Sequence, residues 1–109
     1  MLSRYQVESD KSIAKSTAAN TRNVDLEPCR KFSITVVPDT AHTYGVKVNW
    51  APDILTGDGK VQDAAITSAS QGNIVSAVVE CKADLASFEI TNGDTEAAHT
   101  YDVYIHRIE

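Results

Sequence analysis

The sequence predicts an all-β protein, an antiparallel β-sandwich of the immunoglobulin-like or jelly-roll-like kind with an extended N-terminal arm. Apolar and polar residues alternate with a period of two in several short segments, which is typical of half-buried strands. These segments follow one another at intervals of about 8–12 residues, as in sandwiches and barrels. With 109 residues, 42% of them hydrophobic, the chain has the size of one domain that can bury a core. A small closed β-barrel is the alternative fold.

Six strands are expected in the second part of the chain. The clearest alternation covers residues 44–50, where every second residue is large and apolar. Pro38 and Asp39 precede this segment and Pro52 follows it, and these residues favour turns. The tripeptide at residues 92–94, Asn-Gly-Asp, is the strongest short turn signal, because Asn and Gly tolerate positive φ. The expected strands lie at residues 32–36, 44–50, 64–68, 75–81, 88–91 and 101–107.

The same alternation predicts which side chains face the interior. In each expected strand, the large apolar residues share one face and the polar residues share the other. The predicted core consists of Phe32, Ile34, Val46, Val48, Trp50, Val75, Val79, Phe88, Ile90, Val103 and Ile105.

The first 27 residues differ from the remainder in composition and charge. Residues 9–23 contain one large aliphatic side chain, Ile13, and bury too little apolar surface to offset their ordering entropy. Up to Lys31 the chain has six basic and four acidic residues, net +2, whereas the remainder has four and eleven, net −7. We therefore expect an extended or flexible arm over residues 1–27 and a β-sandwich domain over residues 28–109. The arm can dock on its own body or on a neighbour, unless the charges are distributed by chance.

Two cysteines, Cys29 and Cys81, flank Trp50 in an order that also occurs in immunoglobulin domains. The first interval is long for that pattern, and Val79 stands where a tyrosine corner needs tyrosine. Cys81 shares a face with Val79 and is expected to be a small buried hydrophobe. A reducing compartment disfavours a disulfide between the two cysteines, which stays the less favoured alternative.

Residues that carry catalytic or metal chemistry do not form a known pattern in this sequence. His42 and His99 are expected to be solvated loop residues, and no nucleophile elbow, zinc-protease motif or phosphate-binding loop occurs. The aspartates at 53, 58 and 63 lack the spacing of a calcium loop. Glu89 and Asp102 can face each other as paired carboxylates, but so few aromatic residues leave little for a sugar cleft. The sequence therefore predicts no enzyme, no catalytic residues, no cofactor and no metal.

Composition also excludes several classes of partner. No run of 18 or more apolar residues is present, so no membrane span or membrane partner is expected. The N-terminal residues lack the apolar core of a signal peptide. A net charge of −5 and a pI near 5.1 argue against nucleic acid as a partner.

The segments SFEITNG at residues 87–93 and YDVYI at residues 101–105 combine short polar-faced strands with a tight turn. In these segments and in its Ser/Thr/Ala-rich composition, the chain resembles small virion proteins of tailed bacteriophages. Those are capsid decoration (cement) proteins and head or tail accessory proteins. The resemblance implies a non-enzymatic structural role, assembly on a capsid or tail lattice, and a homo-oligomer or multiple copies. It also implies a location in the virion, after synthesis in the host cytoplasm without a signal peptide.

The candidate interface combines the arm with the outer face of the last strand. An apolar tip on a polar tether suits strand addition to an open sheet edge of another subunit. The six interface candidates are Leu2, Tyr5, Val7, Ile13, Tyr104 and His106. The alternative function is an immunoglobulin-like or carbohydrate-binding recognition module for adhesion, which would use the loops at residues 51–60 and 94–99.

Overall fold

The computed structural model describes residues 2–26, 30–51, 61–70, 72, 74–75, 78–82 and 85–108, with the backbone alone for residues 2–5, 51, 61–70, 74–75 and 108. All the elements found there are strands, so this part of the chain contains no helix that could cross a bilayer. The strands are β1 (Leu2–Ile13), β2 (Ala18–Asn20), β3 (Val24–Asp25), β4 (Lys31–Pro38), β5 (Tyr44–Ala51), β6 (Val61–Ser70), β7 (Ile74–Val75), β8 (Val79–Glu80), β9 (Leu85–Asn92) and β10 (His99–Ile108).

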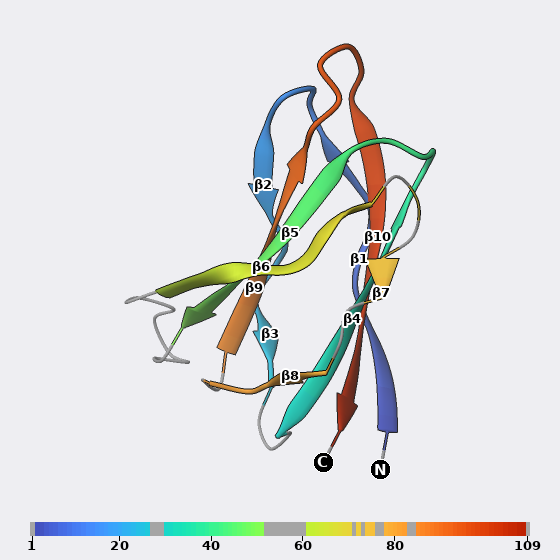
Figure 1. The fold of residues 1–109 in the computed structure, drawn as a ribbon. Helices are drawn as coiled ribbons and strands as arrows, with labels where there is room; N and C mark the ends of the chain where they lie inside the picture. The colour runs from blue at the N-terminus through green and yellow to red at the C-terminus, as the bar shows by residue number, and fades with distance from the viewer. Residues whose placement is uncertain are drawn as a thin grey trace.

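The strands form two antiparallel sheets that pack face to face (Figure 1). Sheet A has the order β1-β10-β4-β7, and β8 also pairs with β4. Sheet B has the order β2-β9-β5-β6, and β3 also pairs with β9. Neither sheet closes on itself among the described strands, so the prediction of a β-sandwich is confirmed and the barrel alternative is not adopted.

The core lies between the two sheets, where alternate residues of β4, β5, β9 and β10 meet. Ten of the eleven predicted core residues have described side chains: nine of these are buried, and Val79 packs partly buried against them. The side chain of Val75 lies outside the described part. The expected strand at residues 75–81 is two short strands instead, because β7 and β8 pair separately with β4.

The N-terminal segment is part of the sandwich, which corrects the predicted division at residue 27. β1 pairs with β10 along its length, while β2 and β3 both pair with β9, so residues 2–25 contribute to both sheets. Four apolar side chains of this segment, Val7, Ile13, Val24 and Leu26, are buried in the core. The composition argument failed because these few residues are spaced so that each one reaches the interior. The segment is extended, as expected, but it is not an arm separate from the domain.

The two ends of the sandwich differ. At one end, β1 and β10 bring Leu2 opposite Ile108, so the two ends of the described chain lie side by side (Figure 1). At the other end, which we call the apex, three connections come together. They are the β1–β2 corner at residues 14–17, the β4–β5 loop at residues 39–43 and the β9–β10 loop at residues 93–98.

Candidate functional site

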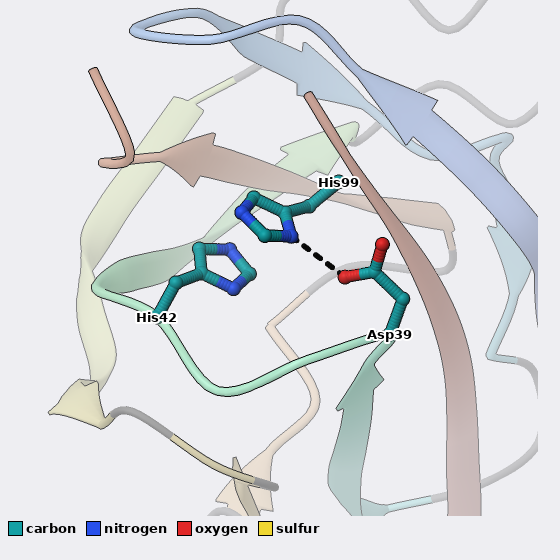
Figure 2. A group of neighbouring side chains, drawn as sticks. All are labelled: Asp39, His42 and His99. Carbon is teal, nitrogen blue, oxygen red and sulfur yellow. Dashed lines mark hydrogen bonds and ion pairs between the residues drawn. The ribbon is translucent and has the colours of Figure 1, made fainter. Parts of the chain in front are cut away.

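Five side chains at the apex form a hydrogen-bonded polar cluster, which we call the apical cluster: the buried His42, His99 and Tyr101, the half-buried Asp94 and the exposed Asp39. The two histidine rings stack almost parallel, with centroids 3.6 Å apart and planes 7° apart (Figure 2). Each histidine is only 8% exposed. The prediction that both are solvated loop residues is therefore wrong.

His99 lies between two carboxylates that come from different loops. Its Nδ1 is 2.7 Å from Asp39 Oδ1 and its Nε2 is 2.7 Å from Asp94 Oδ2. An ionised carboxylate can only accept hydrogen bonds, so both ring nitrogens must carry protons for both bonds to form. His99 is therefore an imidazolium in this arrangement. The hydrogen bond to Asp94, followed by the one to Asp39, raises the pKa of His99 above its ordinary value of 6.5.

The two carboxylates respond in the opposite direction. The hydrogen bond from His99 lowers the pKa of Asp94, and backbone N–H groups of Glu96 and Ala97 contribute to the same effect. For Asp39, burial raises the pKa, but the hydrogen bonds from His99 and from the backbone outweigh it and the net pKa is lowered. The cluster is therefore held as one cation between two anions.

His42 has a different set of partners, which define its tautomer. Its Nδ1 is 2.8 Å from the carbonyl oxygen of Thr40, and a carbonyl can only accept, so Nδ1 carries the proton. Its Nε2 then accepts from the Tyr101 hydroxyl at 2.5 Å. Burial, followed by the charges nearby, raises the pKa of Tyr101, so its hydroxyl keeps the proton that it donates. A neutral His42 thus stacks on a charged His99.

The cluster contains the residue types of a metal site, but their geometry does not fit one. Asp39, His42 and His99 each offer a ligand atom, and these atoms lie within 4.8 Å of one another. Lone pairs of imidazole lie in the ring plane, so two rings stacked 7° from parallel direct their lone pairs side by side and not toward one ion. Both nitrogens of each ring also have hydrogen-bond partners. The arrangement is that of a hydrogen-bonded structural cluster.

Asn92 connects the cluster to the β1–β2 corner. This fully buried side chain donates from Nδ2 to the carbonyl oxygens of Ile13 (3.1 Å), Ala14 (3.3 Å) and Ala97 (3.1 Å), and its Oδ1 accepts from the backbone N–H of Asp94 (2.9 Å). The backbone of the corner is also held, since Ser16 N–H donates to Asp94 O at 3.0 Å. The three apical connections are therefore joined by one network.

The structure separates the six predicted interface residues into three groups. Val7 and Ile13 are at most 2% exposed and face the core, so in this fold their side chains cannot reach a partner. Leu2 and Tyr5 belong to β1, where their backbone pairs with Ile108 and Ile105 of β10, and their side chains lie outside the described part.

Tyr104 and His106 form the third group. They alternate with the buried Val103 and Ile105 of β10 and lie, half-buried, on the outer face of sheet A. There Tyr104 Oη accepts a long hydrogen bond of 3.4 Å from Gln6 Nε2 of β1. These two side chains lie on the face predicted for them. Whether they form an interface stays a prediction.

Other sequence-based site predictions have different outcomes. Glu89 and Asp102 do not face each other, because Glu89 lies on β9 in sheet B and Asp102 on β10 in sheet A. Residues 52–60, which include two of the aspartates considered for calcium and most of one candidate recognition loop, lie outside the described residues, as does Cys29. Cys81 packs partly buried against the core. In the other candidate loop, the side chains of Asp94 and His99 bond to each other, and His99 also bonds to Asp39 of the β4–β5 loop.

Sequence reasoning missed the apical cluster, but one signal could have indicated the histidines. The alternation of β5 continues backward from Tyr44 to position 42, and that of β10 from Tyr101 to position 99. Extending the period of two by one step therefore puts both histidines on the inward face. No local signal links them to Asp39 and Asp94, because the partners come from separate loops.

Comparisons with known proteins show a shared fold without close sequence similarity. No protein-family model matches the chain, and no curated protein matches its sequence. The solved structure of the PBSX exported protein XepA matches 97% of this chain with a TM-score of 0.71 and 11% identity, and the match covers 37% of XepA. The VP2 protein of infectious bursal disease virus, in T=1 particles, matches 100% of this chain with a TM-score of 0.64 and 7% identity, covering 32% of VP2.

The SPBc2 prophage-derived protein YomS is similar over nearly its whole length. The match covers 97% of this chain and 93% of YomS, with a TM-score of 0.61 and 6% identity. The chain therefore spans about a third of the length of XepA and VP2 and almost all of YomS. At these identities the likeness establishes the fold, a β-sandwich that also occurs in viral and prophage-derived proteins.

Proposed function

We propose that this chain is a non-enzymatic structural protein of a viral particle, and specifically a capsid decoration or head or tail accessory protein of a bacteriophage. The observation that carries the proposal is the fold likeness over the whole chain to VP2 in T=1 particles and to the prophage-derived YomS. A β-sandwich that serves as one building unit in a larger coat protein can also serve as a separate unit on a lattice.

The apical cluster supports a structural role over catalysis. Its imidazole nitrogens and carboxylates bond to one another, to Tyr101 or to the backbone. A general base or nucleophile must instead direct an atom toward a substrate. Among the described residues, this cluster is the one group of histidine and acidic side chains close enough to bind a metal, and its stacking is unsuited to that use.

The outer face of sheet A is the surface we propose for contact with a capsid or tail partner. Tyr104 and His106 lie on it at the middle of the sheet, flanked by Ser33 and Thr35 of β4. Tyrosine is enriched at protein interfaces because its ring adds apolar area while its hydroxyl keeps a polar partner. Because β1 is paired with β10 within its own domain, it is not a free arm for addition to another subunit, and we propose the outer face of sheet A as the contact surface instead.

The test is to find the chain in particles and then to alter this face. Gradient-purified particles of the virus that encodes the chain are analysed by quantitative peptide mass spectrometry. We expect its peptides to sediment with the capsid at a constant copy number, and to be reduced at least tenfold in the double variant Tyr104→Ala with His106→Ala. Thr91→Ala, an exposed site on sheet B, is the matched control and keeps full incorporation.

Two results would contradict the proposal. A chain that stays at the top of the gradient, apart from all particles, is not a virion component. Full incorporation of the double variant would keep the virion role and remove sheet A as the interface. Deleting residues 1–27 is not a suitable test, because that deletion removes three strands and four core side chains.

A further inference from the structure

We propose that the apical cluster is a proton-operated clasp, which fastens the β1–β2 corner to the body of the sandwich and opens when His99 gives up one of its two ring protons. The ligand that operates the clasp is therefore the proton. Its loss from His99 releases the β1–β2 corner, through which β1 continues into the rest of the chain. This inference goes beyond the proposed function and does not depend on it.

His99 can bond to both carboxylates only while both of its ring nitrogens carry protons. Asp39 and Asp94 approach opposite nitrogens of the ring, each at 2.7 Å. A neutral imidazole has one N–H, so it can donate to one carboxylate only, and the other carboxylate then faces a lone pair at hydrogen-bond distance. The side chain of His99 is 9% exposed, so little water reaches the ring itself, whereas the carboxylates of Asp39 and Asp94 are 39% and 25% exposed.

Asp94 links His99 to the β1–β2 corner. While Oδ2 of Asp94 accepts from His99, Oδ1 accepts from the N–H groups of Glu96 (2.8 Å) and Ala97 (3.3 Å), and this fixes the β9–β10 loop. The carbonyl oxygen of the same Asp94 accepts from Ser16 N–H in the corner. Ser16 has a φ of 52°, a conformation that a non-glycine residue keeps only when its surroundings hold it.

The carboxylates around His99 favour its protonated form. Asp39 faces the ring from the end of β4, Asp94 from the β9–β10 loop and neutral His42 from the β4–β5 loop. Tyr44 of β5 and Tyr101 of β10 pack beside His42 as neutral rings. Asp10 of β1 and Asp102 of β10 line a cavity of about 80 Å³ next to Asp39. Both ionised groups that bond to His99 are thus carboxylates, whereas the basic residues near this end of β1 and in the corner are Lys11, opposite Tyr101, and Lys15.

The sign of the pH effect follows from the direction of each pKa change. Folding raises the pKa of His99, so its contribution to stability is complete below 6.5 and is lost as pH rises through the higher value in the folded protein. Folding lowers the pKa values of Asp39 and Asp94, so their contribution is complete above 3.8 and is lost as pH falls through the lower folded values. The clasp is closed between these limits and opens above them, where His99 loses a proton, and below them, where the carboxylates gain one.

The experiment is nuclear magnetic resonance of the whole chain across that range. Long-range ¹H–¹⁵N spectra report protonation at each ring nitrogen, and amide exchange expressed as protection factors reports opening of the corner. We expect both His99 nitrogens to be protonated near pH 6 and His42 to carry its proton on Nδ1. The protection of Ser16 N–H should fall together with the titration of His99, by about tenfold if closure lifts its pKa by one unit.

Two variants and a control make the outcome decisive. His99→Gln keeps a donor for one carboxylate without a titrating group, so corner protection should be low and should no longer follow pH between 6 and 9. Asp39→Asn should shift the opening to lower pH, because one of the two anions that favour the imidazolium is removed. His106→Gln, on the outer face of sheet A, should behave as the wild type.

The proposal is overturned if the protection of Ser16 stays constant through the titration of His99. It is equally overturned if the wild-type pH dependence persists in His99→Gln, or if the ring of His99 carries a single proton near pH 6. Should His99→Gln fail to fold, the wild-type titration and Asp39→Asn still decide between these outcomes.

Discussion

Two aromatic clusters lie at opposite ends of the same sandwich, and they are built on different principles. At the end opposite the apex, which we call the base, Phe32 packs edge-on against Trp50 and Phe88, with ring centroids 6.0 and 5.8 Å apart, and these three rings form the base cluster. At the apex, Tyr44 and Tyr101 lie 5.5 Å apart beside the stacked histidines, and their polar atoms have hydrogen-bond partners.

The two ends differ in what holds their side chains in place. The base cluster gains stability in proportion to the apolar area removed from water, and it needs only rings of suitable size. The apical cluster must satisfy every buried donor and acceptor, so it holds the loops in one arrangement and depends on pH. The base cluster therefore accounts mainly for stability, and the apical cluster for the conformation of the loops.

The largest effect is expected from opening a cavity in the base cluster. Phe32→Ala removes a fully buried ring that contacts two other rings and should lower the free energy of unfolding by about 3–5 kcal/mol. Urea denaturation measures the loss, and its dependence on pH should match that of the wild type. Val78→Ala, at a side chain that is 55% exposed, serves as the control. A loss below about 1 kcal/mol would show that the base cluster does not dominate stability.

An intermediate effect is expected from Asn92→Ala at the apex. The change removes the donors for three carbonyl oxygens and the acceptor for Asp94 N–H, all around a fully buried side chain. We expect a loss of about 3 kcal/mol, since buried groups are left without partners. Asn23→Ala, at an exposed loop position, is the matched control. If denaturation shows the loss but amide exchange in the β1–β2 corner is unchanged, the link from Asn92 to that corner is refuted.

The smallest effects come from two glycines near the apex, and they should have opposite signs. A Cβ at Gly93 would stand 2.8 Å from the carbonyl oxygen of Thr43, so Gly93→Ala must shift backbone and should cost about 1–3 kcal/mol. A Cβ at Gly45 meets nothing within 4 Å, and Gly45→Ala in β5 should stabilise by about 0.5 kcal/mol. Thermal unfolding of the two variants measures both changes in stability. Equal effects would mean that the apical loops are no more tightly fitted than the open face of β5.

The base cluster could be predicted from the sequence, whereas the apical cluster could not. Phe32, Trp50 and Phe88 each sit in a clear alternation, and a strand that alternates needs no knowledge of its partner to bury one face. His42, Asp94 and His99 acquire their roles only when three loops meet. That meeting depends on long-range topology, which single-sequence patterns do not encode.

The N-terminal segment was misjudged for a related reason. Val7 and Ile13 are isolated apolar residues in a polar stretch, so a count of composition undervalues them. Their burial depends on pairing with β10, which lies some 90 residues further along the chain. The sequence of an edge strand of this kind shows little apolar alternation, because its partner strand supplies most of its stability.

The pairing of Leu2 with Ile108 places the entry and the exit of the described chain side by side, at the end opposite the apex. A domain with that geometry can be inserted into a surface loop of a host protein with little disturbance, because it opens the host chain by only one strand spacing. The same geometry permits circular permutation, in which the old ends are joined by a short linker and new ends are cut in an exposed loop. When the sandwich is inserted into a host loop through the adjacent ends of β1 and β10, its apical loops point away from the host.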